Sequence, residues 1–194
     1  MSAPTRAELV RATERVLNAG RQRNPDVLLV RHEGRSVVVK DFAGRGWFVR
    51  RFLAPWLARR ELRAWQALEG HPAVPRALGA VDALAFAVEY RPGRTLFSAK
   101  RQPVPEGFLA ALADALAEMH RRGVVHLDLK NRTNVLADEQ GRPVLIDFGA
   151  ALVFTPGSWP ARWLLPLFAA FDRRALAKWN AKQTKRERRA REGW

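Results

Sequence analysis

Residues 126–149, HLDLKNRTNVLADEQGRPVLIDFG, constrain the fold of this chain more than any other stretch. Two short apolar runs, Val-Leu and Val-Leu-Ile, flank residues 138–143, which have the polar, Gly- and Pro-containing composition of a turn. The pattern therefore predicts a β-hairpin. One carboxylate, Asp128, comes before this hairpin and another, Asp147, comes directly after it, so the hairpin would hold an acid at each end.

The same stretch resembles the catalytic loop and the metal-binding segment of protein kinases, H-R-D-L-x-x-x-N followed by D-F-G. Residues 126–129 match the first motif with Leu in place of Arg, and Asp147, Phe148 and Gly149 match the second motif in full. The chain is thus similar to the protein-kinase superfamily. This resemblance implies an α+β, two-lobed fold with a small N-terminal β-rich lobe and a truncated helical C-terminal lobe, with the substrates meeting between the lobes.

The resemblance also implies roles for individual residues. Asp128 would accept or orient the proton of the substrate hydroxyl, Lys130 would face the transferred phosphoryl group, and Asn134 and Asp147 would hold Mg²⁺. The template has its Asn five residues after the Asp, whereas Asn134 lies six after Asp128. Asn131 is the rival ligand; Asn134 is favoured because the first apolar run follows it directly. Taken singly, such residues are ordinary turn and cap residues, but their order around a hairpin favours a site.

The N-terminal part predicts a helix and then a hairpin. Ala7 to Leu17 carries apolar residues at helical spacing, and two β-branched runs, 27–30 and 37–40, are joined by a short polar segment containing Gly34. The second run, VVVK, resembles the kinase V-A-I-K strand, which implies that Lys40 binds the phosphates of ATP.

The partner of Lys40 would come from a helix predicted at Ala58 to Leu68. The resemblance implies that Glu61 pairs with Lys40, with Glu69 as the weaker candidate; an exposed Glu61 pairing with neighbouring arginines is the structural alternative. The glycine-rich phosphate loop expected before Lys40 is degenerate, because its position offers only Gly20. Arg21 or Arg23 would have to replace some of its backbone donors.

The middle of the chain predicts short strands at Val74 to Leu78 and Ala83 to Val88, then a helix at Phe108 to His120 that ends at Gly123. Between them, Glu89 to Gly93 resembles the kinase hinge, which implies that Glu89 and Arg91 belong to the adenine-binding segment. We expect one kinase-like domain in residues 1–194, with an N-terminal lobe in 1–91, a C-terminal lobe in 92–172 and a basic helix or tail in 173–194.

Charge is concentrated at the two ends of the chain. The net charge is +15, to which residues 1–60 contribute +8, residues 61–172 nothing and residues 173–194 +7. Basic ends indicate a polyanionic partner, although a solvated arginine-rich surface is the simpler explanation. The chain has no cysteine, which excludes disulfides and thiolate metal sites, and its polar N-terminus lacks a signal-peptide core, so a cytoplasmic protein is expected.

The C-terminal part combines apolar aromatic residues with a basic tail. The stretch Trp159 to Phe171 is too short, and too often interrupted by Pro, to span a bilayer. We expect at least half of its large apolar residues to pack beneath the catalytic lobe, and a separate helix to start with Asp172 as its cap. The tail from Lys178 to Arg191 would then draw the protein to an anionic membrane or a phosphorylated glycolipid, which would make it peripheral at the inner membrane.

The kinase resemblance implies an ATP- and Mg²⁺-dependent phosphotransferase, whose acceptor we expect to be a hydroxyl of a protein Ser/Thr or of a lipopolysaccharide-type sugar. The chain most resembles the small bacterial kinases grouped with RIO kinases and lipopolysaccharide (Kdo/heptose) kinases. The resemblance lies in the residues of the loop motif and in the short region after Gly149, which lacks an A-P-E motif. A pseudokinase or scaffold that binds nucleotide without transferring phosphate is the alternative. A nucleic-acid partner is disfavoured, because no aromatic-basic readout motif accompanies the basic ends.

Overall fold

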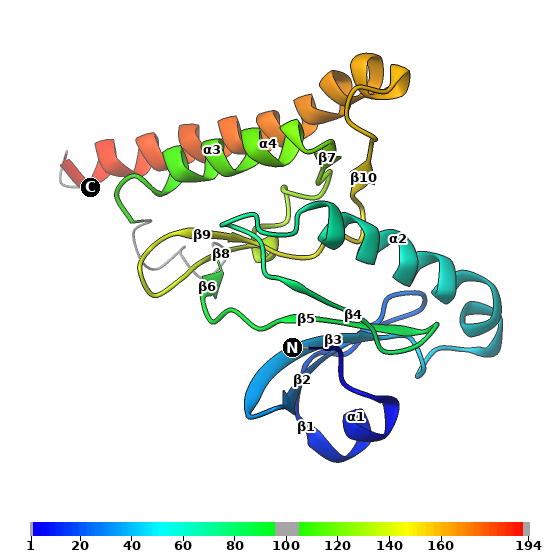
Figure 1. Cartoon of the computed structure of the whole chain (residues 1–194). Coiled ribbons are helices and arrows are strands. Elements are labelled where there is room, and N and C mark those ends of the chain that lie inside the picture. The colour runs from blue at the N-terminus through cyan, green and yellow to red at the C-terminus, as the bar shows by residue number, and fades with distance from the viewer. Residues whose placement is uncertain (1, 96–104, 192–194) are drawn as a thin grey trace. The chain divides into compact units, whose positions relative to one another are not determined.

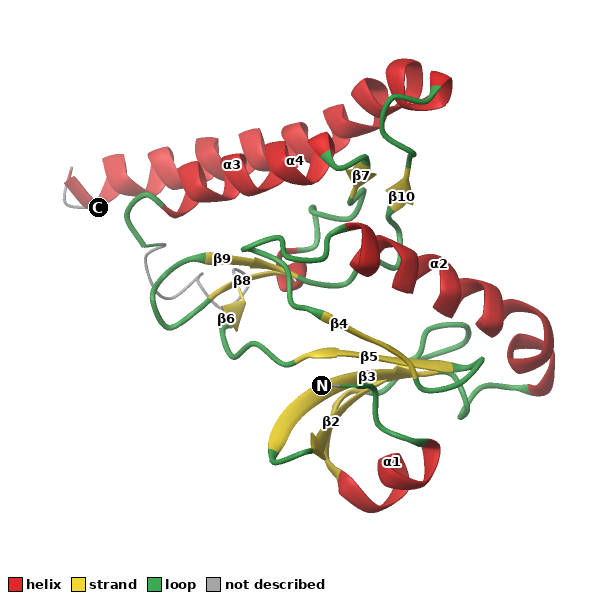
Figure 2. Ribbon diagram, in the orientation of Figure 1, coloured by secondary structure: helices red, strands yellow, loops and turns green. Residues whose placement is uncertain are grey.

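The computed structural model describes residues 2–95 and 105–191 (Figure 1). It divides into two compact units: one contains the chain up to Gly70 together with Pro75–Arg91, and the other contains His71–Val74 and the chain from Pro92 onward. Strands dominate the first unit and helices the second (Figure 2). The chain is therefore α+β, as expected, with its β-rich part first.

The first unit is a five-stranded sheet, in the order β1-β2-β3-β5-β4, with two helices. Its elements are α1 (Arg6–Ala12), β1 (Thr13–Asn18), β2 (Asp26–His32), β3 (Arg35–Asp41), a π-helical turn (Val49–Leu53), α2 (Ala54–Ala67), β4 (Ala77–Ala80) and β5 (Ala85–Glu89). The predicted hairpin of β2 and β3 is confirmed, with His32 opposite Arg35. Glu33 and Gly34 form the two-residue turn, and both have positive φ (48° and 77°), as a turn matching the twist of a hairpin requires.

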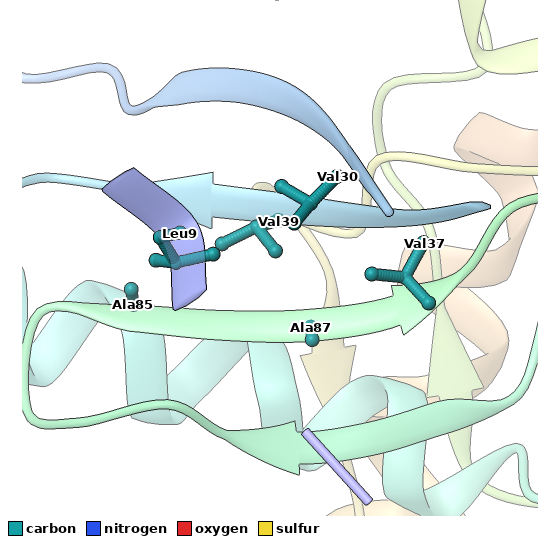
Figure 3. Packing of buried hydrophobic residues seen from close by; sticks show 6 residues of the cluster. All are labelled: Leu9, Val30, Val37, Val39, Ala85 and Ala87. Atoms are coloured by element: carbon teal, nitrogen blue, oxygen red, sulfur yellow. The ribbon is translucent and has the colours of Figure 1, made fainter. Parts of the chain in front are cut away.

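Alternation along the strands separates the two faces of this sheet. Val37 and Val39 join a buried cluster on the face that carries α1, whose other members are Leu9, Val30, Ala85 and Ala87 (Figure 3). Because neighbouring residues of a strand point to opposite faces, Lys40 lies on the other face, which α2 covers. Phe86, opposite Lys40 in the ladder, is also buried.

The predicted helix Ala7 to Leu17 is wrong in its second half. A capping box between Thr5 and Glu8 starts α1, but the helix ends at Ala12 and the chain continues as β1. β1 pairs antiparallel with β2, for example Thr13 with Val30. The β-branched residues of this segment suit a strand, and the available edge of β2 outweighs the weak helical pattern.

The second unit contains two helices and short paired strands. Its elements are β6 (Arg94–Thr95), α3 (Phe108–Arg121), β7 (Val124–Val125), a 3-10 turn (Arg132–Asn134), β8 (Val135–Ala137), β9 (Pro143–Leu145), β10 (Leu152–Val153) and α4 (Trp159–Arg191). β8 and β9 form the predicted hairpin, with Val135 opposite Leu145. β6 extends this hairpin, and β7 pairs with β10.

α4 differs from the prediction, because it is one helix that contains Pro166 and in which Asp172 is an interior residue, not a cap. α4 runs beside α3 (Figure 1). The side chains that α4 buries recur at helical spacing and are mostly small or polar: Ala169, Asp172, Ala175 and Trp179.

The large apolar residues at the start of α4 are mostly exposed, so the expectation that at least half of them pack into the core is wrong. Exposed are Trp159, Trp163, Leu164, Leu167 and Phe171, while Leu165 and Phe168 are half-buried. Most of them precede Ala169, the first buried residue of α4. In the described ranges, no helix has both the length and the apolar character needed to cross a membrane. Residues 192–194 of the predicted tail lie outside the described part.

Candidate functional site

The β8–β9 hairpin brings Asn134 and Asp147 to the same end of the second unit. Asn134 directly precedes β8, and Asp147 follows β9 after one residue. The Ile146 N–H donates to the Asn134 carbonyl at 3.0 Å. This hydrogen bond connects the segment before β8 to the segment after β9, next to Asp147. The hairpin pattern in the sequence thus places these two candidate residues as neighbours.

Asn134 is buried and bonded to Asp128. Its amide nitrogen donates to the Asp128 carboxylate at 2.9 Å and to the Asp128 carbonyl at 3.1 Å. The amide oxygen therefore points to the other side, where the Thr133 hydroxyl lies 3.3 Å away. The 3-10 turn Arg132–Asn134 lies between Asp128 and Asn134, in the part of the loop that is one residue longer than the template.

The rival residue, Asn131, has a different position. It is exposed and caps the 3-10 turn, with its side-chain oxygen accepting from the Thr133 hydroxyl at 2.7 Å and from the Thr133 N–H at 3.3 Å. Lys130 is also exposed, two residues after Asp128, and the intervening Leu129 is buried. Both residues contact Asp128: the Asn131 backbone N–H donates to the Asp128 carbonyl at 3.3 Å, and the Asn134 side chain donates to the Asp128 carboxylate.

His126 connects the loop to the segment after the hairpin. Its ring is fully buried and lies 4.9 Å from the ring of Phe148. One ring nitrogen is 3.1 Å from the Ile146 carbonyl, and the other is 3.4 Å from the Asp128 N–H. The first residue of the loop motif and the aromatic residue of the second motif thus pack together and hold Asp128 and Asp147 in place.

Two non-glycine residues of the site have a left-handed backbone. Leu127 has φ of 66° and Asp147 has φ of 65°. This conformation is uncommon for residues with a Cβ and persists only where the surroundings impose it. Leu127 directly precedes Asp128, and Asp147 is itself a candidate ligand. The unfavourable backbone conformation therefore occurs where the two carboxylates are oriented.

Asp172 of α4 binds the backbone of the loop at Leu127, one of these two residues. Its carboxylate, 1% exposed, accepts the backbone N–H groups of His126 and Leu127, each at 2.9 Å. It also lies 3.0 Å from the His120 ring nitrogen on α3. Sequence analysis missed this role by treating Asp172 as a cap. One signal was present: Asp172 is the only acidic residue between Asp147 and Glu187.

The first unit contains a buried ion pair between strand and helix. The Lys40 ammonium, on β3, lies 2.6 Å from a Glu61 carboxylate oxygen on α2, and both side chains are at most 10% exposed. The Trp65 indole N–H is 3.4 Å from the same oxygen. Glu69, the weaker candidate, instead pairs with Arg76 at the surface. The pairing expected from the resemblance is confirmed, and the exposed-surface alternative for Glu61 is not.

The other candidate binding residues are also in the first unit. Glu89 ends β5, and its carboxylate accepts from Arg91 at 3.2 Å and from the Arg76 N–H at 3.0 Å. At the β1–β2 connection, the Gly20 N–H donates to Asp26 at 2.8 Å, and Arg45 binds the same carboxylate. The Gly20 amide therefore serves this turn. Arg21 and Arg23 are exposed beside it.

The oxygen donors fit a hard divalent cation. Mg²⁺ prefers carboxylate and amide oxygens and keeps several water ligands, so it needs only one or two protein groups. The Asp147 carboxylate and the amide oxygen of Asn134, on the two sides of the hairpin, are donors of this kind. No group of three or more His, Cys, Asp or Glu side chains arranged to hold a metal occurs in the described part of the chain.

Comparison with known proteins identifies kinases as relatives. The chain is 32% identical over 79 residues to a 3-deoxy-D-manno-octulosonic acid kinase of Vibrio parahaemolyticus, covering 41% of this chain and 33% of the relative. It is 32% identical over 139 residues to the serine/threonine-protein kinase pkn2 of Myxococcus xanthus, covering 63% and 16%. It is 38% identical over 79 residues to the serine/threonine-protein kinase PKH3 of Saccharomyces cerevisiae, covering 38% and 9%.

The matched part of this chain spans a third or less of the length of each of these relatives. A broader match comes from the model of the protein kinase domain, which covers residues 27–164 and so includes Lys40, Glu61, the loop and the hairpin. The chain belongs to the protein kinase domain family.

Proposed function

We propose that this protein transfers the γ-phosphoryl group of ATP to a hydroxyl acceptor. The observation that carries the proposal is the Asp128–Asn134 pair beside Asp147 at the end of the hairpin. Phosphoryl transfer requires positioning and charge neutralisation more than covalent help from the protein, so a few correctly oriented groups suffice. Family membership and kinase relatives support the reaction class.

Each group has a distinct task in this proposal. Asp128 orients the acceptor hydroxyl and takes its proton, and Lys130 offers a positive charge to the transferred group. In the first unit, Lys40 binds ATP phosphates and Glu61 holds the lysine in position, while the backbone of the Glu89–Arg91 segment meets the adenine. Asn134 and Asp147 would hold Mg²⁺, which when bound neutralises charge on the phosphates.

The acceptor that we propose is a sugar hydroxyl of a lipopolysaccharide-type glycolipid, with a protein Ser/Thr as the second candidate. Residues 150–158 alone connect Gly149 to α4, whose Asp172 returns to the loop. This connection leaves little chain for an activation segment that would hold an extended peptide, and no A-P-E motif occurs. Similarity to a 3-deoxy-D-manno-octulosonic acid kinase supports a sugar, whereas the two serine/threonine-protein kinases support a protein. A place among the small RIO-like bacterial kinases is part of this proposal.

The basic C-terminus supports a position at an anionic membrane. Residues 173–194 contain nine basic and two acidic residues, and the preceding part of α4 exposes Trp159, Trp163 and Phe171. Aromatic side chains next to cations suit the interface of an anionic leaflet. We propose that this segment brings the enzyme to the membrane that carries its glycolipid.

The test of the reaction is transfer of labelled phosphate from ATP by the purified protein to lipid A-core material, to a generic protein acceptor and to itself. Asp128→Ala should lower transfer by at least about a hundredfold while nucleotide binding changes little, because the carboxylate acts on the acceptor hydroxyl. Asp114→Ala, an exposed position on α3, is the matched control. Mg²⁺-dependent ATP binding without transfer to any acceptor would instead assign the protein to the pseudokinases.

A further inference from the structure

The segment leading into α2 exposes a continuous aromatic surface. Trp47, Phe48, Phe52 and Trp56, here called the α2 aromatic surface, are each more than half exposed. The Phe52 ring centroid lies 5.7 Å from that of Trp47 and 5.3 Å from that of Phe48. Large apolar side chains that touch one another at the surface mark an interaction site, unlike apolar residues scattered singly.

A π-helical turn produces this arrangement. The Ala54 N–H donates to the Val49 carbonyl, so the turn from Val49 to Leu53 contains an additional residue before α2 starts. π-helical turns are rare and often occur at functional sites. After the turn, Ala58, Glu61 and Leu62 face the sheet, while Phe52 and Trp56 face solvent. The aromatic surface thus lies on the side of α2 opposite Glu61, and it is separate from the Lys40–Glu61 pair.

Arginines surround these aromatic residues. Arg51, Arg59, Arg60 and Arg63 line a hollow of about 480 Å³ together with Phe52 and Trp56. The Arg51 guanidinium lies 5.5 Å from the centre of the Phe52 ring, and that of Arg60 lies 5.1 Å from the centre of the Trp56 ring. These contacts keep the cations beside the aromatic faces.

Acidic residues are nearly absent from this region. Between Asp41 and Glu69 the sequence contains only one, Glu61, which is 4% exposed and is paired with Lys40. This segment therefore presents apolar rings and positive charge with no exposed carboxylate of its own; Ala83 also lines the hollow, and its neighbour Asp82 is paired with Arg6. A second copy of this chain would bring like charges together, so self-association through this face is disfavoured.

We propose that the α2 aromatic surface and its arginines dock on an anionic phospholipid bilayer. The aromatic rings would enter the boundary between headgroups and acyl chains, and the guanidinium groups would bind lipid phosphates. Amphipathic helices at membrane interfaces make the same two kinds of contact. The same composition recurs independently at the start of α4, where exposed aromatic residues precede a basic tail. This recurrence favours a lipid surface over an acidic protein partner. The proposal does not depend on phosphate transfer.

The test is sedimentation of the full chain with vesicles of phosphatidylcholine, with or without phosphatidylglycerol. Two double variants probe the two components: Phe52→Ser with Trp56→Ser, and Arg59→Ser with Arg63→Ser. The control, Arg11→Ser with Arg15→Ser, removes the same charge from exposed positions on α1 and β1. Each surface variant should bind anionic vesicles at least about tenfold more weakly than the control variant. Only the arginine variant should also reduce the dependence on salt.

Binding of both surface variants equal to that of the control would overturn the proposal and leave the basic tail as the membrane contact. Loss of binding to polyglutamate with no effect on vesicles would also overturn it, and would indicate an acidic protein partner. Thermal unfolding would establish whether each variant is folded. A further variant, Trp56→Phe, keeps the apolar surface; it should retain vesicle binding but show weaker quenching of tryptophan fluorescence by brominated phospholipid. Unchanged quenching would place Trp56 outside the bilayer.

Discussion

At the residue scale, the two asparagines of the loop show how burial separates a site residue from a cap. The Asn131 side chain is exposed and bonds to Thr133 of its own turn, whereas the Asn134 side chain is buried and donates to the Asp128 carboxylate. From the sequence, both asparagines were candidate metal ligands, because an insertion changes the spacing between Asp and Asn in the motif. The hydrogen bonds of Asn134 orient its amide oxygen away from Asp128, and this orientation supports Asn134 as the ligand.

The first prediction separates these two residues. Asn134→Ala should lower phosphate transfer by roughly ten- to a hundredfold and raise the Mg²⁺ concentration needed for half-maximal activity, because it removes an oxygen donor and a partner of Asp128. Asn131→Ala should change activity less than about threefold, since it weakens only an exposed cap. Magnesium titrations of turnover measure both effects. A larger Mg²⁺ shift in the Asn131 variant would transfer the role to Asn131.

At the element scale, α4 supports the loop through one interior side chain. Asp172 accepts two backbone N–H groups from residues 126 and 127. Asp172→Asn keeps the size of the side chain but turns an amide NH₂ toward N–H donors. We expect the free energy of unfolding to fall by about 2–4 kcal/mol and phosphate transfer to fall at least about tenfold, since Leu127 loses the contact that holds its backbone.

Chemical denaturation and turnover measure the two effects, with Asp114→Asn as the control because Asp114 is exposed on α3. Full activity in a stably folded Asp172→Asn protein would show that the left-handed conformation of Leu127 does not need this carboxylate.

The hairpin turn gives a pH prediction. Partial burial alone would raise the pKa of the Asp138 carboxyl, but hydrogen bonds from the Arg142 N–H and guanidinium lower it by more, so the pKa lies below its ordinary value of 3.8. The folded state thus favours the ionised form. The resulting stability is present above the ordinary pKa and is lost as pH falls through the lower folded value.

Asp138→Asn should therefore lower the melting temperature at neutral pH, and the difference from the unmodified protein should shrink below about pH 4. Melting curves across this range, with Glu139→Gln as a control at an adjacent exposed position, measure the effect. A difference that stays constant into acid would show that the charge of Asp138 is not involved.

At the scale of the whole molecule, the distribution of charge suggests how the protein finds a surface. Residues 181–194 contain six basic and two acidic residues. Deleting them should weaken salt-sensitive binding to anionic vesicles, because each basic group near such a surface contributes on the order of 1 kcal/mol. The melting temperature should change little, because the buried residues of α4 up to Trp179 are retained. Vesicle sedimentation at several salt concentrations is the measurement; equal binding of the intact chain to neutral and anionic vesicles would refute the prediction.

The sequence by itself determined the local structures of this protein. The β2–β3 and β8–β9 hairpins, α2 and α3 follow from apolar periodicity and from turn residues, which act over a few neighbouring positions. The motif residues of the loop and the hairpin could be located for the same reason. Their resemblance to a kinase also anticipated the Lys40–Glu61 pair, which joins positions 21 residues apart.

Tertiary structure decided what depends on distant partners. Thr13 to Asn18 is a strand because the edge of β2 is available to it. Asp172 is an interior anchor because the loop 45 and 46 residues earlier presents unpaired N–H groups to it. Most aromatic residues at the start of α4 are exposed, because the side chains that α4 packs into its unit begin only at Ala169. In each instance a contact between residues far apart in the chain outweighs the local pattern, since burial and hydrogen bonding contribute more free energy than intrinsic propensity.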